Sequence, residues 1–387
     1  MSSQPVLQLP PLSLYVHMPW CVVKCPYCDF NSHALQGELP EDQYIKALLA
    51  DLELDLPNVW GRVVHSIFIG GGTPSLFSAQ QIDHLLSGVR ARLPLSPTAE
   101  ITLEANPGAV EHDRFEAYRQ AGINRISLGI QSLNTDHLKT LGRIHNADEA
   151  HLAIEAVQKA GFDRINLDLM WALPGQTLDQ MLADLEGVLA YETGHVSHYQ
   201  LTIEPNTVFA AKPPTLPDAD TAWEMGEAAA DVFRSKGYAP YEISAWAKPS
   251  HASAHNLNYW RFGDYIGIGA GAHGKMTLPA EQTILRTRRK MIPHSYLAAF
   301  DHRAFVAQSE AVAPKDRAFE YFLNRFRLAE PIAWSDFESF TGLRRNEIHQ
   351  PLEKARSLGL VELSDTHIVR TPMGARYLND LQQMFLD

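Results

Sequence analysis

The chain has 387 residues, of which 45% are hydrophobic and 20% are charged, as expected for a globular protein with a substantial core. Its length allows two or three domains, or a barrel that takes up most of the chain. The formal net charge of −12 argues against nonspecific binding to nucleic acid or anionic membranes, and no apolar run approaches the ~18 residues of a membrane span. Residues 1–11 lack the basic start and apolar core of a signal peptide, so we expect a cytoplasmic protein.

Short β-rich runs alternate with amphipathic helical runs over the first half of the chain. Strands are predicted at 12–16, 63–69, 100–104, 125–130, 165–170 and 198–203, and helices at 42–54, 80–92, 113–121 and 149–160. The motif QAGINRI at 120–126 returns as KAGFDRI at 159–165, and each copy is typical of a helix end, a glycine and a new strand. The pattern predicts an α/β fold with a parallel sheet, and six units instead of eight predict a partial (β/α)6-type barrel.

The second half of the chain is organised differently. A helix is predicted at 219–236, ended by Gly237, and the segment 242–275, rich in glycine, histidine and aromatic residues, is predicted to form loops over the sheet. The basic run RTRRK at 286–290 is predicted to be a solvated strand or loop edge.

Beyond a boundary near 309–314 the chain resembles a mostly helical winged-helix domain. Helices are predicted at 315–328, 335–340 and 344–358, followed by a hairpin at 360–363 and 367–370 and a last helix capped by Thr371. We therefore divide the chain into a tail (1–11), a barrel (12–240), a connecting segment packed on the barrel (241–310) and a C-terminal domain (311–387).

The three cysteines of the chain, Cys21, Cys25 and Cys28, form the motif C-x3-C-x2-C directly after the first predicted strand. They are too few for a disulfide framework, and a tetrahedral zinc site normally needs four ligands. Three thiolates suit a [4Fe–4S] cluster that leaves one iron open to a chelating ligand. The alternatives are a zinc knuckle completed by His17 or His33, or buried cysteines without a metal.

The cysteine spacing, the aromatic residue Tyr27 and the position after the first strand resemble the radical S-adenosylmethionine (SAM) superfamily. The resemblance implies a partial barrel that holds the cluster at its rim. It also implies that the open iron of the cluster binds the amino and carboxylate groups of SAM.

A glycine-rich turn, GGGT at 70–73, follows the second predicted strand. Glycines let the backbone approach a ligand closely and expose N–H groups to an anion, although a glycine triplet alone is more often just a tight turn. At this place Gly71, Gly72 and Thr73 resemble the superfamily segment that holds the amino group of SAM.

Polar residues also stand at or just beyond the ends of the later strands, where a barrel places its chemistry. These residues are Glu104, Gln131, Arg143 and Asp168. Taken alone, each of these is typical of a polar residue at the rim of a barrel with no role in ligand binding. Together with Tyr15 they resemble the SAM-contacting set of the oxygen-independent coproporphyrinogen III dehydrogenases, HemN. The resemblance implies that Glu104 and Asp168 bind the ribose or amino end of SAM, with Gln131 nearby and Arg143 near the carboxylate.

Two departures from the HemN pattern favour the related HemW group of haem chaperones. Phe30 stands where HemN has a further cysteine, and only residues 1–11 precede the first strand. The segment HNLNYW also resembles the haem-binding pattern H-N-x-x-Y-W of the HemW group. That resemblance implies haem contacts from His255, Asn256, Tyr259 and Trp260.

The chemistry of this segment suits haem, because neutral imidazole ligates haem iron and flat aromatics pack on a porphyrin face. If the segment is helical, His255 and Tyr259 share one face. The alternative is a core histidine beside packed aromatics, and His251 and His273 are rival ligands.

The HemW resemblance implies a protein that holds a SAM-chelated [4Fe–4S] cluster, binds haem and passes it to apo-haemoproteins, such as respiratory enzymes at the membrane surface. A homodimer is compatible with this role, and neither a nucleic-acid partner nor a membrane span is expected. The run 286–290 would then be a candidate for charge-assisted bonds to haem propionates. One alternative is a coproporphyrinogen III dehydrogenase, in which a radical formed from SAM takes hydrogen from propionate side chains. Others are a radical SAM enzyme with another substrate, and DNA binding by the C-terminal domain, which the acidic balance disfavours.

Overall fold

The structure, a computed structural model, describes residues 5–108 and 114–386. At its centre six strands run parallel: β1 (Leu12–Met18), β4 (Val64–Gly71), β5 (Leu95–Ala105), β6 (Arg125–Gln131), β7 (Arg164–Trp171) and β8 (Gly194–Gln200). All six are predicted from the alternating pattern, but the prediction for β8 is shifted, because the strand begins at Gly194 and not at residue 198. The buried polar residues His195 and Ser197 hide its first half from a hydrophobicity pattern.

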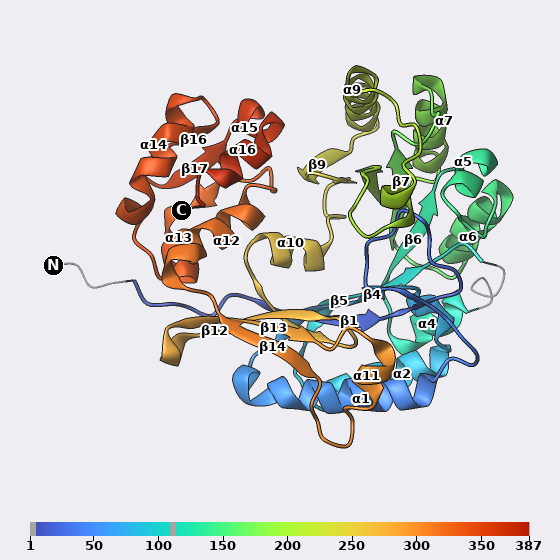
Figure 1. Cartoon of the computed structure of the whole chain (residues 1–387), viewed down its shortest axis with the longest axis horizontal. Helices are drawn as coiled ribbons and strands as arrows, with labels where there is room; N and C mark the ends of the chain where they lie inside the picture. The colour runs from blue at the N-terminus through green and yellow to red at the C-terminus, as the bar shows by residue number, and fades with distance from the viewer. Residues whose placement is uncertain (1–4, 109–113, 387) are drawn as a thin grey trace.

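Helices connect these strands on the outer face of the sheet (Figure 1): α1 (Glu41–Asp55), α2 (Ala79–Arg90), α4 (Phe115–Ala121), α5 (Thr135–Thr140), α6 (Ala147–Lys159) and α7 (Leu178–Leu189). A further helix, α9 (Ala219–Ser235), follows β8. Their apolar side chains, such as Tyr44, Ile82 and Tyr118, form one continuous core with the strands. Full burial of each such side chain stabilises the fold by roughly 1.5–3 kcal/mol. The predicted start of α4 at residue 113 lies outside the described residues.

The segment 242–275 is not the set of loops that we predicted. It holds the strands β10 (Ala245–Ala247), β11 (Asp264–Ile268) and the first part of β12 (His273–Leu278), and the helix α10 (Ala254–Trp260). β11 pairs in parallel with β1, residue by residue from Asp264 opposite Leu12. A charged first residue conceals this strand in the sequence. In the structure the Asp264 carboxylate is fully buried and pairs with Lys275 at 2.9 Å and Arg62 at 2.8 Å.

Antiparallel strands extend the sheet beyond the predicted barrel at both ends. β9 (Ala239–Glu242) and β10 follow β8, while β12, β13 (Thr283–Arg289) and β14 (Val306–Ala311) follow β11. Within the described residues the order is β14-β13-β12-β11-β1-β4-β5-β6-β7-β8-β10-β9, and no pairing joins the edge strands β9 and β14. The fold is therefore α/β with an open, curved sheet.

The basic run 286–290 is only partly at the surface, so the prediction of a solvated edge is wrong for two of its arginines. Arg289 is completely buried at the end of β13, where it pairs with Asp51 and Asp55 of α1. Arg286 pairs with Glu320 of the C-terminal domain. Both guanidinium groups are thus occupied by carboxylates of the chain itself.

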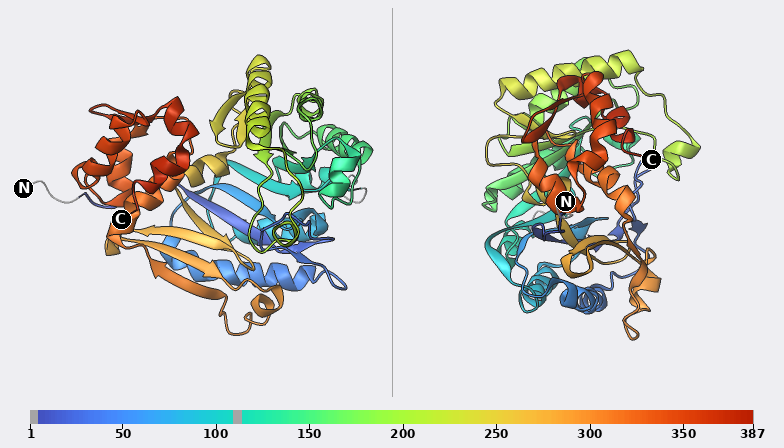
Figure 2. Two further views of the ribbon diagram at one scale, coloured as in Figure 1. Left: turned by 45° about the horizontal axis from the view of Figure 1, so that its top comes forward. Right: turned by 90° about the vertical axis from the view of Figure 1, so that its left-hand side faces the viewer.

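The C-terminal part forms a mostly helical body beside the sheet, coloured orange to red in Figures 1 and 2. It contains α12 (Arg317–Arg325), α13 (Trp334–Thr341), α14 (His349–Ser357), α15 (Pro372–Arg376), α16 (Leu378–Gln383) and a small antiparallel sheet of β15 (Ile332–Ala333), β17 (His367–Arg370) and β16 (Val361–Leu363). The hairpin that we predicted is β16–β17. Leu7, from the predicted tail, is buried in the same core, and the backbone N–H of Gln8 donates to the carbonyl of Ser339.

The helices of the described residues contain none that is both long and apolar enough to cross a membrane.

Candidate functional site

A cavity of about 540 Å³ lies at the carboxyl ends of the parallel strands, where a sheet of this kind usually binds its ligands. Most of the predicted site residues line it together, although they come from seven separate parts of the fold. They are Cys21, Cys25, Tyr27, Cys28, Gly71, Gly72, Thr73, Glu104, Gln131, Arg143, Asp168, Asn256 and Trp260. Tyr15, His255 and Tyr259 are not among its lining residues.

The cysteine loop connects β2 (Trp20–Cys21) with β3 (His33–Ala34) and carries three free thiols. Burial raises the pKa of the Cys21 thiol, and Thr73 opposes this rise by a side-chain hydrogen bond. The Arg143 guanidinium donates a hydrogen bond to Cys25 Sγ at 3.7 Å. The donor set, three thiols beside a buried cation, therefore fits a cluster held by thiolates.

The zinc alternative fits the loop poorly. His17, the suggested fourth ligand, bonds the Tyr15 hydroxyl through Nδ1 and the Asn31 carbonyl through Nε2. Nε2 of His33 lies 3.2 Å from the Asn31 side chain. Both imidazoles are thus engaged away from the thiols.

The glycine turn after β4 is tied directly to the cysteine loop. The backbone N–H groups of Gly72 and Thr73 donate to the carbonyls of Met18 and Trp20 at 2.7 and 2.8 Å. A Cβ atom on Gly72 would lie 2.6 Å from the Trp20 carbonyl oxygen, so only glycine permits this approach. These two hydrogen bonds fix the position of the glycine turn relative to the cysteine loop.

Two carboxylates share the interior of the cavity. Glu104, at the end of β5, accepts the Gly71 N–H at 2.9 Å, and burial together with Asp168 raises its pKa to about 7. Burial also raises the pKa of Asp168, which accepts hydrogen bonds from Asn166 at 2.8 Å and Ser127 at 3.3 Å. Like charges this close favour a ligand that brings positive charge or hydroxyl donors.

Arg143 and Gln131 occupy the rim above β6. The guanidinium of Arg143 donates to Asn106 Oδ1 at 2.5 Å and to the Gly129 carbonyl at 2.9 Å. Gln131 has a positive φ of 68°, a conformation that side chains rarely adopt and that is concentrated at functional sites. These contacts fix the part of the rim where Arg143 meets the cysteine loop at Cys25.

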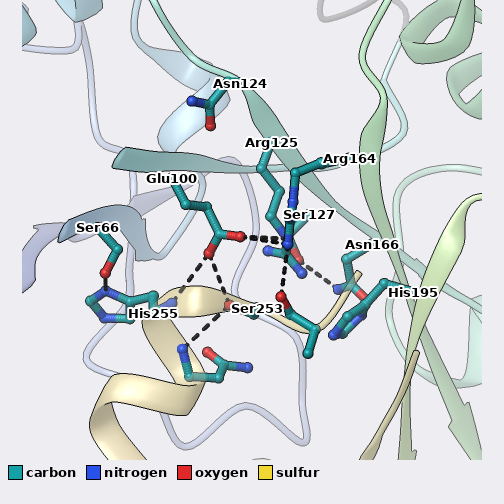
Figure 3. Close-up of polar contacts among 12 residues, drawn as sticks. Ser66, Glu100, Asn124, Arg125, Ser127, Arg164, Asn166, His195, Ser253 and His255 are labelled. Atoms are coloured by element: carbon teal, nitrogen blue, oxygen red, sulfur yellow. Dashed lines mark hydrogen bonds and ion pairs between the residues drawn. The ribbon is translucent and has the colours of Figure 1, made fainter. Parts of the chain in front are cut away.

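Helix α10 crosses the inner side of β4, β1 and β11 and presents two different faces. Asn256 and Trp260 face the cavity. His255 is buried and does not line the cavity itself; its ring lies 5.1 Å from that of Phe68, a lining residue, and its Nδ1 lies 3.1 Å from Ser66 Oγ (Figure 3). Burial lowers the pKa of His255 to about 3, so its imidazole is neutral.

The remaining aromatic and histidine candidates lie outside the cavity. Tyr259 packs between Trp260 and Tyr265, with ring centroids 4.7 and 5.1 Å away. His251 bonds the Pro249 carbonyl at the surface, and His273 is exposed at the start of β12. The predicted haem segment therefore reaches the cavity through Asn256 and Trp260.

Sequence models of two families match the chain: that of the Radical SAM superfamily over residues 15–187, and that of the HemN C-terminal domain over residues 312–377. The protein named heme chaperone HemW in Escherichia coli (strain K12) is 50% identical over 382 residues, which cover 98% of this chain and 100% of that protein. The chain belongs to the HemW family.

Other relatives agree with this placement in the HemW family. The HemW protein of Haemophilus influenzae is 48% identical over 384 residues, covering 98% of this chain and 99% of its own. The solved structure of coproporphyrinogen III oxidase, HemN, from Escherichia coli has the same fold, with a TM-score of 0.82 over 97% of this chain and 90% of that chain, at 22% identity. The family resemblance predicted from the motifs is confirmed.

Several residues of the HemW cavity were not found from the sequence. Ser127, Asn166 and Arg125 belong to polar ladders along β6 and β7, and the alternation of polar with apolar residues could have revealed them. Arg327 comes from the C-terminal domain, where its guanidinium lies 4.3 Å over the ring of Trp260. No local signal in the sequence indicates that contact.

Proposed function

We propose that this chain is a haem chaperone that holds a SAM-chelated [4Fe–4S] cluster and haem in one cavity. The observation that carries the proposal is the position of α10, which brings Asn256 and Trp260 to the cavity lined by the three cysteines. The relatives that match nearly the whole chain are named heme chaperones, which supports the same role here.

Cys21, Cys25 and Cys28 would hold the cluster, which when bound supplies an open iron for the methionyl end of SAM and an electron. The N–H groups and carbonyls of the glycine turn lie next to that position. The acid pair Glu104 and Asp168 lies deeper and suits the ammonium and hydroxyl groups of SAM. The rim residues Gln131 and Arg143 enclose the same ligand from β6, together with Tyr27 from the cysteine loop. Tyr15 acts indirectly, through its bond to His17.

Haem would lie against Trp260, with Asn256 beside it and Tyr259 supporting Trp260 from behind. His255 lies next to the lining residue Phe68, and it suits an iron ligand because it is neutral and its Nδ1 is held by Ser66. When Nδ1 donates to Ser66 Oγ, the lone pair of Nε2 is free to bind iron. No hydrogen bond to Nε2 occurs within the described residues.

The deciding experiment reconstitutes the cluster without oxygen and adds SAM, dithionite and either haem or coproporphyrinogen III. Stoichiometric haem binding without protoporphyrinogen IX supports the chaperone. Repeated turnover to protoporphyrinogen IX contradicts it and assigns the dehydrogenase activity instead.

Replacing His255 with Ala is expected to change the shape of the Soret band and to lower haem affinity, because the iron loses its protein ligand. A haem titration followed by absorbance measures both effects. Ser66→Ala is the matched control, since it removes the partner of Nδ1 but keeps the ring. An unchanged band and affinity in His255→Ala would exclude His255 as the ligand.

Replacing Glu104 with Gln is expected to weaken SAM binding about tenfold or more and to remove its pH dependence. Because the pKa of Glu104 is about 7, its ionised fraction and the SAM affinity rise as the pH passes through that value and level off above about pH 8. The same raised pKa means that the folded state binds more protons than the unfolded chain, so stability falls as pH rises through about 7.

Glu104→Gln should therefore bind SAM poorly and yet be more stable than the parent protein above that pH. Calorimetric titration of SAM and thermal unfolding at several pH values test the two parts. The exposed Glu116 of α4 gives a control, Glu116→Gln, that leaves both unchanged. A wild-type pH profile in Glu104→Gln would assign the titration to another group.

Transfer to apo-haemoproteins in the cytoplasm, including respiratory enzymes at the membrane surface, is the next part of the proposal. Val22, Val23 and Phe30 of the cysteine loop are each more than half exposed, and exposed apolar side chains beside a ligand site suit a protein partner. Mixing haem-loaded protein with an apo-b-type cytochrome and following the two spectra tests transfer. Light scattering with and without SAM tests for a homodimer.

A further inference from the structure

A buried ionic cluster of Glu100, Arg125 and Arg164 lies near the amino ends of β6 and β7 (Figure 3). Arg125 begins β6, Arg164 begins β7 directly opposite, and both face Glu100 of β5. Arg164 Nη2 lies 3.0 Å from Glu100 Oε2, and its guanidinium also donates to the carbonyls of Ser250 and Ala252. Arg164 thus has three partners on its own side of the ionic cluster, although its buried Nε makes no hydrogen bond.

The Glu100 carboxylate is largely occupied as well. Its other oxygen, Oε1, accepts the Ser253 hydroxyl at 3.3 Å and the His255 N–H at 3.2 Å. These two contacts tie Glu100 to the start of α10. Both oxygens of the Glu100 carboxylate therefore already have partners, Arg164 on one side and the start of α10 on the other.

Arg125 differs from its neighbour. It is only 2% exposed and lines the cavity, but its closest carboxylate oxygen, on Glu100, is 3.9 Å away. Within the described residues its guanidinium makes no hydrogen bond. A buried guanidinium whose five N–H donors have no acceptors is energetically unfavourable, so an anion that binds Arg125 from the cavity would be stabilised.

The other arginines near the site are already paired. Arg143 donates to Asn106 and Gly129, and Arg327 pairs with Glu242 at 3.2 Å. Arg286 and Arg289, from the run that we considered for propionates, are paired with carboxylates of the chain. Among the cavity arginines that the structure describes, Arg125 alone has no hydrogen bond.

Charge is also unequally distributed inside the cavity. Glu104 and Asp168 lie toward the cysteine loop, at the carboxyl ends of the strands. Ser127, which contacts Asp168, is the next inward-facing residue of β6 after Arg125. Burial raises the pKa of both acids, and the charge of Arg125 opposes that rise, so the three groups share one space. An anionic group that enters the cavity is therefore repelled by the acid pair and attracted to Arg125.

We propose that Arg125 is a carboxylate receptor that binds a propionate of the porphyrin held against Trp260 and Asn256. The inference rests on the proposed function and adds the orientation of the ligand to it. A guanidinium binds a carboxylate through two parallel N–H···O bonds, and in a buried site such a pair is strong and geometrically selective. Arg125 is placed for this by β6, and Asn256 lines the same cavity.

The test compares haem with haem dimethyl ester, whose propionates carry no charge, on the full-length protein with its cluster reconstituted. Wild type is expected to bind haem about tenfold to a hundredfold more tightly than the ester. Arg125→Met should lose this preference. Arg164→Met is the matched control. Arg164 also pairs with Glu100 but does not line the cavity, so this variant should still bind haem more tightly than the ester.

The outcomes separate this inference from the proposed function. If neither porphyrin changes the Soret spectrum of the wild type, the chaperone proposal fails and this inference fails with it. If haem and its ester bind wild type equally, only the inference is overturned, and this result needs no variant to fold. SAM affinity measured in Arg125→Met is expected to be unchanged; a loss as large as that for haem would assign the carboxylate to SAM and overturn the inference.

Discussion

Replacing Arg289 with Met is expected to lower the free energy of unfolding by about 3–5 kcal/mol, because it leaves buried carboxylates without their counter-ion. Arg289 is completely buried, with Nε 2.8 Å from Asp51 Oδ1 and a second ion pair to Asp55. Tyr296 also donates to Asp51, at 2.8 Å. The cluster joins α1 to β13, so its loss should loosen the extension of the sheet. Urea denaturation of the full chain measures the effect.

The matched control is Arg303→Met, which removes a half-exposed arginine that pairs with Glu53 of the same helix at 2.7 Å. Exposed pairs are worth about 0–1 kcal/mol, so this variant should unfold almost like the parent. Burial raises the pKa of Asp51 to about 6 even beside Arg289. Without the arginine, Asp51 and Asp55 bind protons more tightly. The loss of unfolding free energy in Arg289→Met should therefore become smaller as the pH falls through and below about 6. Equal losses in both variants would contradict the argument.

Replacing Cys25 with Ser is expected to reduce bound iron after anaerobic reconstitution from about four atoms per chain to almost none, since only three thiolates are available. Cys25 lies beside the buried Arg143, so the lost thiolate is also the one with a cation next to it. Iron and sulfide analysis with absorbance spectra measures the loss.

Ser32→Ala provides the control for this variant. The Ser32 hydroxyl lies 3.5 Å from Cys28 Sγ, so the change disturbs the loop without removing a thiol. It should retain the iron of the parent protein. Full iron retention in Cys25→Ser would refute the assignment of these cysteines as the cluster ligands.

The motifs after strands could be placed from sequence because parallel strands end at one edge of a sheet. A residue just beyond the end of any one strand therefore falls near the others, and Cys21, Gly72 and Asp168 meet for this reason. The strand β11 could not be found in this way. Its pairing with β1 joins distant parts of the chain, and its buried Asp264 is neutralised by Lys275 and Arg62, which no local pattern connects.

The haem segment shows a second limit of local reasoning. Helical spacing predicts that His255 and Tyr259 share a face, but it cannot say which face meets the ligand cavity. In the structure the pair on the cavity is Asn256 and Trp260, one residue further along. Likewise Arg289 is buried only because Asp51, 238 residues earlier in the chain, lies opposite it.

The unpaired edges of the sheet have a mechanical consequence. A closed barrel has a radius fixed by its strand number and stagger, so a larger ligand could enter only at the expense of strand pairing. Here β9 and β14 are not joined within the described residues, and α10 lies across the inner face instead of a closing strand. A small change in the coiling of the sheet therefore widens the interior while every inter-strand hydrogen bond is kept. An open sheet of this kind would therefore widen around a broad, flat ligand without losing strand pairing.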